Sequence, residues 1–303
     1  MQHSAIQAEL ITRLPVQNRL GEGVLYHQAS DSVYWTDIKG KTLYRYDLTE
    51  QRLAQFAPPF AISAFGFTDK PGCLIVAFVH AIALYWPESG EAEILHEGES
   101  HLPGNRFNDG KVGPDGNFWI GTMVENPAIN PSGASASLYR FDSQRKLTQA
   151  FDGIRISNGL CWSPDARVMY HADSPLGQIC RYDFADMPSS GKLFVQTESG
   201  ASPDGSCTDS QGRIWNAQWG ASRVCCYSAD GQLLGKLPVP VSQPTCVALG
   251  GKQGDLLFVT SAWDELTDAE RQAQPYAGDL FIYQVNARAL TEPTFVTTTT
   301  DGP

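Results

Sequence analysis

The segment SPDGSCTDSQGRIWNAQ, residues 202–218, contains two turn-like acidic sites where a single pair of strands needs only one. The run from Asp209 to Gly212 is typical of a tight hairpin turn, because Asp and Gly tolerate the backbone angles that such turns require. Asp204-Gly205 lies five residues before that turn, where a strand should already have begun. Asp204 therefore needs another explanation, and the rest of the chain supplies it.

The strand of this segment recurs along the chain. The related segments are DSVYWTD (31–37), GCLIVAF (72–78), DGNFWIGT (115–122), ARVMYHAD (166–173), GRIWNAQ (212–218) and DLLFVTS (255–261). Their central residues are 41 to 51 positions apart, and a second short strand follows each of them. Repeats of about 40–50 residues with roughly four strands each are the signature of a β-propeller.

We therefore predict an all-β fold, in which residues 1–303 form one domain, a six-bladed β-propeller. The blades are expected at roughly 15–58, 59–100, 101–151, 152–198, 199–240 and 241–290, with a closing strand near 8–14. Two β-sandwiches are the alternative, but sandwiches do not predict a regular period. Residues 124–137 form a loop long enough to cover a channel mouth, and residues 265–274 read as a short helix with a capping box.

Composition narrows the class of partner. The formal net charge of −11 disfavours nucleic acid and anionic membranes as partners. No hydrophobic run approaches the roughly 20 residues of a membrane span, and the first residues lack the pattern of a signal peptide. The seven cysteines include no CxxC pair and lie mostly in apolar runs, so we expect buried thiols in a reducing compartment. The predicted location is the cytoplasm.

The position of Asp204 has counterparts in other repeats. A polar residue followed by glycine occurs ten to twelve residues before the repeat centre in four cases, at Glu22, Asp109 (with Asn108 before it), Asn158 and Asp204. The innermost strands of a propeller surround its axis and start at the same end, so these side chains should converge. Ordinary turn chemistry could explain any one of these residues. It does not explain why all four share one register, or why one of them is Glu22, since Glu is a poor turn former.

Carboxylates brought so close repel one another and lose hydration, at a cost on the order of several kcal/mol unless a cation lies between them. Oxygen ligands suit Ca²⁺, Mg²⁺ or Mn²⁺, and carboxylates also bind Zn²⁺. The sequence therefore predicts a metal site at the mouth of the central channel. By contrast, Asp115, Asp165 and Asp209 lie in the hairpin turns, where we expect solvated side chains.

Other catalytic classes find little support. The GKT at 40–42 lacks the glycine that a phosphate-binding loop needs, and there is no GxSxG motif of a serine hydrolase. The six histidines form no HxH or HExxH pattern, and His171 in a strand is expected to be a hydrogen-bonded core residue.

Four segments together resemble the regucalcin (senescence marker protein 30)/gluconolactonase family: LGEGVLY, NRFNDGKVGPDGNFWIGTM, ISNGLCWSPD and SPDGSCTDSQGRIWNAQWG. They occur in the order and at the spacing of that family, over nearly the whole chain. The resemblance implies a six-bladed propeller with one divalent ion at the mouth of its channel. It also implies hydrolysis of sugar-acid lactones.

By position, Glu22, Asn158 and Asp204 match the metal ligands of that family, and Arg106 and Asn108 match residues that hold the substrate. Asp109 matches a supporting residue rather than a ligand, which corrects the inference from register. Asp204 is also the expected catalytic residue, because its second carboxylate oxygen can take a proton from the attacking water. Val24 and Asn126 depart from the family pattern, and Asn126 puts an acidic contact of the lid in question.

The leading hypothesis is a metal-dependent hydrolase of carboxylic esters that converts an aldonolactone to the aldonic acid in carbohydrate catabolism. Ca²⁺ is the expected ion, with Zn²⁺, Mn²⁺ and Mg²⁺ as alternatives, and the partner is a small sugar lactone. The chain is expected to be a monomer or a weak homo-oligomer. The alternatives are a metal-dependent phosphotriesterase, which needs an apolar pocket, and a non-catalytic calcium-binding or protein-docking propeller.

Overall fold

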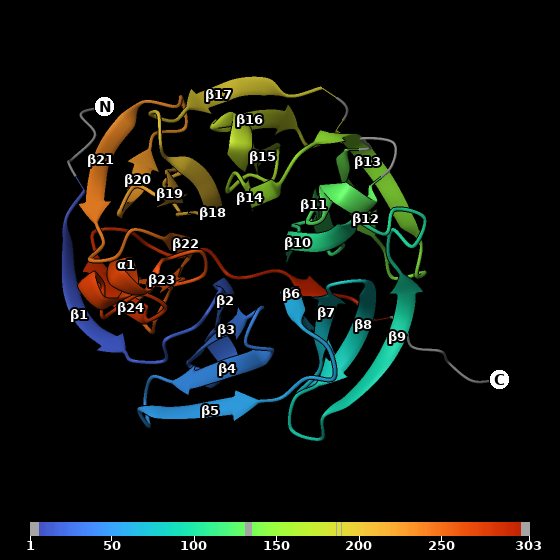
Figure 1. The fold of residues 1–303 in the computed structure, drawn as a ribbon, viewed down its shortest axis with the longest axis horizontal. Helices are drawn as coiled ribbons and strands as arrows, with labels where there is room; N and C mark the ends of the chain where they lie inside the picture. Colours follow the sequence, from blue (N-terminus) through green and yellow to red (C-terminus); the bar gives the residue numbers. More distant parts are fainter. Residues whose placement is uncertain (1–5, 131–134, 186, 189, 298–303) are drawn as a thin grey trace.

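The computed structural model describes residues 6–130, 135–185, 187–188 and 190–297. Six antiparallel sheets stand around a central axis (Figure 1). The prediction of an all-β, six-bladed propeller is therefore confirmed. The first three sheets are β2 (Gly21–His27), β3 (Ser32–Asp37), β4 (Thr42–Asp47) and β5 (Arg52–Phe56); β6 (Ile62–Thr68), β7 (Leu74–Phe78), β8 (Ala81–Trp86) and β9 (Glu91–Glu97); and β10 (Asn105–Val112), β11 (Phe118–Val124), β12 (Ala136–Phe141) and β13 (Leu147–Ile154).

The other three sheets complete the ring. They are β14 (Ser157–Trp162), β15 (Val168–Asp173), β16 (Gln178–Asp183) and β17 (Lys192–Gln196); β18 (Ser202–Thr208), β19 (Ile214–Trp219), β20 (Arg223–Tyr227) and β21 (Leu233–Pro238); and β22 (Pro244–Gly250), β23 (Leu256–Ser261), β24 (Leu280–Val285) and β1 (Ala8–Leu14). Because β1 pairs with β24, the N-terminal strand completes the last sheet. The two-residue strand β25 (Thr294–Phe295) adds to β6 in parallel.

The remaining elements are short. Three 3₁₀ turns are η1 (Gln28–Ser30), η2 (Pro127–Ile129) and η3 (Ser174–Leu176). The single α-helix of the described chain is α1 (Asp268–Ala273); Thr267 is its N-cap, and Thr267 and Glu270 form the predicted capping box. No helix in the described ranges has the length and apolar character needed to span a membrane.

The core lies between neighbouring sheets and is anchored by tryptophans on the second strand of three blades. Trp35, Trp119 and Trp215 are fully buried. A buried indole N–H needs an acceptor, and each of the three finds one in a turn or loop nearby. Trp215 Nε1 donates to Asp209 Oδ2 at 3.0 Å, and Trp35 Nε1 donates to Asn18 Oδ1 at 2.9 Å.

The prediction of a solvated side chain was wrong for Asp209, which is fully buried. Its carboxylate accepts a hydrogen bond from Arg213 Nε at 2.6 Å in addition to that from Trp215. The turn is a hairpin turn, as predicted, but its acidic side chain faces inward because a buried Arg and a buried Trp need an acceptor there. Asp115 and Asp165 are exposed, as expected.

The innermost strands share one irregularity. All six, β2, β6, β10, β14, β18 and β22, have a register shift against their neighbour near their first residues. Such bulges re-aim side chains and increase local twist. In four blades the register shift coincides with the polar residue and glycine seen in the sequence. The direction of those polar side chains is therefore determined by the bulge and not by the regular alternation of a strand.

His171 is a buried core residue, as predicted: it is 3 % exposed, and its Nε2 lies 2.9 Å from Ser157 Oγ. Burial lowers the pKa of His171 from 6.5 to about 3. Between these values the unfolded chain binds a proton that the folded protein excludes. Stability is therefore lost as the pH falls through this window.

We expect the wild type to lose about 2 kcal/mol more of its free energy of unfolding than His171→Gln between pH 6.5 and pH 4.5. The glutamine can retain a hydrogen bond to Ser157 but has no proton to gain. Urea denaturation of both proteins at several pH values, without added metal, checks this, because the other titrating groups contribute equally. Parallel pH profiles would contradict it.

Candidate active site

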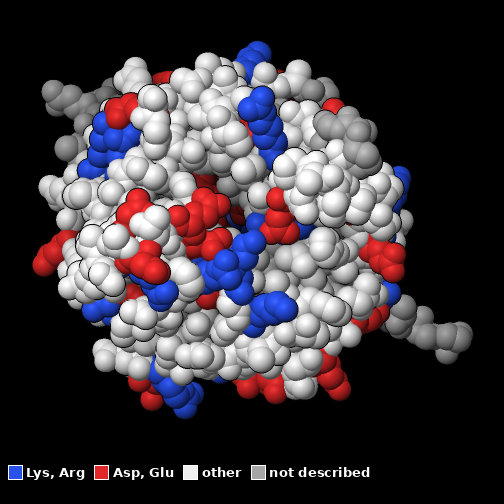
Figure 2. Space-filling view, viewed as in Figure 1, with Lys and Arg blue, Asp and Glu red and all other residues white. Residues whose placement is uncertain are grey.

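Polar side chains from four blades meet where the innermost strands begin. Glu22 comes from β2, Asn108 and Asp109 from β10, Asn158 from β14 and Asp204 from β18. Asn108 Nδ2 lies 3.1 Å from Asn158 Oδ1, and the charges of Glu22 and Asp109 both act on Asp204. The structure thus brings together the residues that their shared register singled out. Figure 2 shows acidic and basic side chains together around the central hollow of the ring.

Among the described residues neither Asp204 nor Glu22 forms an ion pair with a basic side chain, although the charge of Arg106 acts on Glu22. Asp204 is 6 % exposed, and its Oδ1 has no hydrogen-bond partner among the described residues. Burial, and then the charges of Glu22 and Asp109, raise the pKa of Asp204 well above its usual range. Burial, and then Asp109, raise the pKa of Glu22 to about 8. A buried and a half-buried carboxylate that repel each other in this way form the arrangement that a cation relieves.

The amide of Asn158 supplies a neutral oxygen beside these carboxylates. Its Oδ1 accepts a hydrogen bond from Asn108 Nδ2, and its Nδ2 donates to Ser174 Oγ at 2.8 Å. An amide oxygen has two lone pairs, so Oδ1 retains one after the bond from Asn108. No group of three or more His, Cys, Asp or Glu side chains able to hold a metal occurs in the described part of the chain. The oxygen of Asn158 is therefore a further protein ligand that a site built on Glu22 and Asp204 could use.

Arg106 lies beside this cluster, and its side chain is buried, with 5 % of its surface exposed. Its Nη1 donates to Asn108 Oδ1 at 2.9 Å and to the carbonyl of Phe107 at 2.8 Å, and its Nε donates to Glu125 Oε1 at 2.9 Å. Asn108 also donates to the carbonyl of Ser157 at 3.0 Å. Both amide hydrogens of Asn108 are therefore used within the protein.

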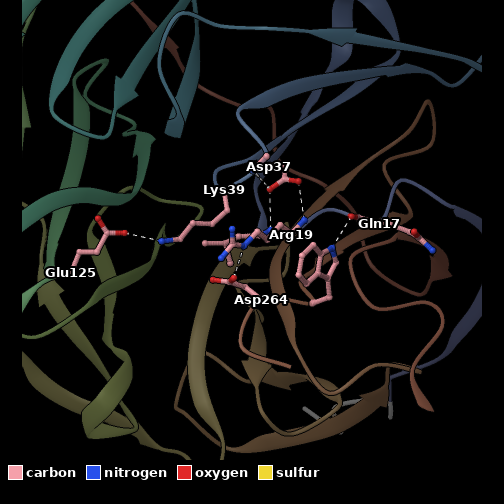
Figure 3. Close-up of polar contacts among 9 residues, drawn as sticks. Gln17, Arg19, Asp37, Lys39, Glu125 and Asp264 are labelled. Carbon is pink, nitrogen blue, oxygen red and sulfur yellow. Dashed lines mark hydrogen bonds and ion pairs between the residues drawn. The ribbon is translucent and has the colours of Figure 1, made fainter. Parts of the chain in front are cut away.

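Two ion pairs on the rim were not foreseen from the sequence (Figure 3). Lys39, in the turn after β3, donates to Glu125 Oε1 at 2.9 Å, so blade 1 reaches blade 3. Arg19 donates to Asp264 Oδ1 at 2.7 Å and so links the start of blade 1 to blade 6. Because β3 runs antiparallel to β2, the turn that carries Lys39 lies at the end where β2 begins. The position of Lys39 directly after β3 could therefore have placed it near the channel mouth from the sequence.

Asp37 positions both cationic segments. Its carboxylate accepts hydrogen bonds from the backbone N–H groups of Arg19 at 2.8 Å, Leu20 at 2.9 Å and Gly40 at 2.8 Å. Asp37 is 5 % exposed. A buried carboxylate with three backbone donors fixes the chain on both sides of it, so Arg19 and Lys39 start from a rigid base.

Glu125 is the second residue of the loop 124–137, of which residues 131–134 lie outside the described ranges. The lid role of this loop stays a prediction. Partial burial alone would raise the pKa of Glu125, but the hydrogen bond from Lys39 and the charge of Arg106 hold it below its usual range. Glu125 is thus an ionised partner for two cations.

The two cations should differ in their dependence on Glu125. Removal of the exposed pair in Lys39→Ala is expected to lower the free energy of unfolding by at most about 1 kcal/mol. Glu125→Ala should cost about 2 kcal/mol, because it leaves the buried Arg106 guanidinium without its carboxylate. Urea denaturation measures both values, and equal losses would show that Arg106 does not depend on Glu125.

Comparisons with known proteins find relatives over nearly the whole chain. The family model described as "SMP-30/Gluconolactonase/LRE-like region" matches residues 20–263. An L-arabinolactonase of Azospirillum brasilense is 33 % identical over 300 residues, 98 % of each chain. A 6-deoxy-6-sulfogluconolactonase of Pseudomonas putida is 32 % identical over 280 residues, 91 % of this chain and 94 % of that protein.

A crystal structure of regucalcin from Agrobacterium tumefaciens, described as a calcium-binding protein, superposes with a TM-score of 0.87 at 31 % identity. The match covers 94 % of this chain and 97 % of that one. The motifs, the fold and the extent of these matches agree, and the chain belongs to the SMP-30/gluconolactonase/LRE-like family.

Proposed function

We propose that this protein is a divalent-metal-dependent lactonase that hydrolyses a sugar-acid lactone to the aldonic acid. The observation that carries the proposal is the pairing of the buried Asp204 with the half-buried Glu22, together with an oxygen of Asp204 that has no hydrogen-bond partner among the described residues. The lactonase activity named for the two relatives supports it.

The residues at the channel mouth fit a divalent ion. Glu22, Asn158 and Asp204 would hold it through oxygen atoms, which favours Ca²⁺ and also admits Mg²⁺, Mn²⁺ or Zn²⁺. The crystal structure of a relative described as calcium-binding supports Ca²⁺ as the first ion to test. When bound, such an ion polarises a lactone carbonyl and makes a bound water more acidic.

The chain's own groups account for substrate orientation and proton transfer. Arg106, always charged, suits the hydroxyls of a sugar and the carboxylate that hydrolysis creates. Asp204 would take the proton of the attacking water and return it to the ring oxygen as the ester bond breaks. Asn108 contributes its remaining acceptor capacity to the substrate and also holds Asn158.

Two other functions are less well supported. A phosphotriesterase needs an apolar pocket, whereas Arg106, Asn108 and Glu125 form a polar, charged wall beside the carboxylates. A purely calcium-binding propeller would need Glu22, Asn158 and Asp204 but not a buried Arg106. A cytoplasmic location and a monomeric or weakly oligomeric state stay predictions from the sequence.

The test measures acid release from a panel of five- and six-membered aldonolactones by metal-stripped protein, with Ca²⁺, Mg²⁺, Mn²⁺ or Zn²⁺ returned singly. We expect metal-dependent turnover that falls at least about 100-fold in Asp204→Asn, which loses both a ligand charge and the base. Asp115→Asn, a change in an exposed turn, is the matched control and should keep full activity. Hydrolysis no faster than the spontaneous rate with every ion would overturn the proposal.

A further inference from the structure

Ser174 lies in the turn between β15 and β16, one residue beyond the end of β15. Its backbone N–H donates to the carbonyl of Ile156 at 3.2 Å, and the carboxylate of Asp173 accepts a hydrogen bond from the N–H of Ile156 at 3.1 Å. Gly177 closes the turn in the left-handed conformation at φ 64°. The turn is therefore fixed to the segment that leads into β14, directly before Asn158.

The hydroxyl of Ser174 joins two blades. It accepts a hydrogen bond from Asn158 Nδ2 at 2.8 Å and donates one to the carbonyl of Pro203 at 2.7 Å. Ser174 is 8 % exposed. Pro203 directly precedes Asp204 on β18, so one buried hydroxyl contacts the side chain of one proposed ligand and the backbone beside another.

The directions of these bonds are determined. The carbonyl of Pro203 can only accept, so the hydroxyl hydrogen of Ser174 points to it and a lone pair faces Asn158. A reversed amide would place the oxygen of Asn158 against that lone pair and its NH₂ against the NH₂ of Asn108. Ser174 and Asn108 together therefore allow a single orientation of the Asn158 amide, with Oδ1 on the side of Asn108.

The backbone of Asp204 is held from the other side as well. Asn216 Nδ2, on β19, donates to the carbonyl of Asp204 at 2.8 Å. The carbonyls of Pro203 and Asp204 thus have separate side-chain donors, one from blade 4 and one from blade 5. The hydroxyl of Ser174 thus links the start of β18, beside Asp204, to the side chain of Asn158 on β14.

We propose that Ser174 is a positioning residue of the metal site, which fixes the oxygen of Asn158 and the start of β18 relative to each other. This inference rests on the proposed function, because it takes Asn158 and Asp204 as ligands. Ser174 touches neither ion nor substrate. Partners behind the ligands of other metal sites change metal affinity by 10- to 100-fold when they are removed.

The experiment measures metal binding directly, by calorimetry on the metal-stripped full chain with Ca²⁺, and with Mg²⁺, Mn²⁺ and Zn²⁺ in turn. We expect Ser174→Ala to bind the ion preferred by the wild type at least about 10-fold more weakly. Ser63→Ala is the matched control. It removes another buried serine hydroxyl, which donates to the carbonyl of Ala77 at 3.0 Å, from the innermost strand of blade 2. Ser63→Ala should bind the ion as the wild type does.

A double-mutant cycle separates positioning from general loss of stability. If Ser174 acts through Asn158, Ser174→Ala should weaken binding much less in an Asn158→Ala background than in the wild type. Ser174→Cys keeps the size of the side chain but forms weaker hydrogen bonds, so it serves if the alanine variant does not fold, and it too should bind the ion more weakly.

Unchanged affinity in a folded Ser174→Ala or Ser174→Cys protein would overturn this inference alone, while the wild type still bound the ion. Equal effects of Ser174→Ala in both backgrounds would also overturn it. A wild type that binds none of the four ions would overturn the proposed function and this inference with it. Unfolding curves of each variant confirm that the proteins compared are folded.

Discussion

Closure of the ring is the constraint on which the site depends, because it brings Glu22 and Asp204 together and makes their carboxylates repel each other. They lie on strands more than 180 residues apart in the sequence, and only the complete circle of blades makes them neighbours. The ring is closed by the pairing of β1 with β24. The hydroxyl of Thr245 also contributes, because it donates a hydrogen bond to the carbonyl of Gly21, beside Glu22. The contact that closes the ring therefore lies next to the charge that closure makes costly.

The bulges of the innermost strands explain why glycine follows these polar residues. Gly23 has φ 60°, which a side chain rarely adopts, so the backbone can turn directly after Glu22. At Gly205 the constraint is space, because a Cβ would lie 2.4 Å from Cys246 Sγ on the neighbouring innermost strand. Close approach of neighbouring blades and re-aiming of polar side chains are thus two consequences of the same residue pattern.

The fold and the gathering of Glu22, Asn158 and Asp204 could be predicted from the sequence because both follow from one period. A repeat fixes which positions are equivalent, and a propeller places equivalent positions together. Features set by individual side-chain contacts escaped prediction. Asp209 looks like any turn residue until Arg213 and Trp215 are seen to need it, and the contact of Ser174 is to a carbonyl, which every residue has.

The hydrogen bonds behind the site run in one direction. Arg106 donates to Asn108, Asn108 to Asn158, Asn158 to Ser174 and Ser174 to the carbonyl of Pro203. The first group can only donate and the last can only accept, so no intermediate amide can reverse without breaking two bonds. Arg106, which can only donate, and the carbonyl of Pro203, which can only accept, therefore together determine which atom of Asn158 faces Asn108. The groups suited to bind the sugar and those suited to bind the ion belong to one hydrogen-bond network. We therefore expect a substitution at one end of the network to alter the hydrogen bonds at the other end.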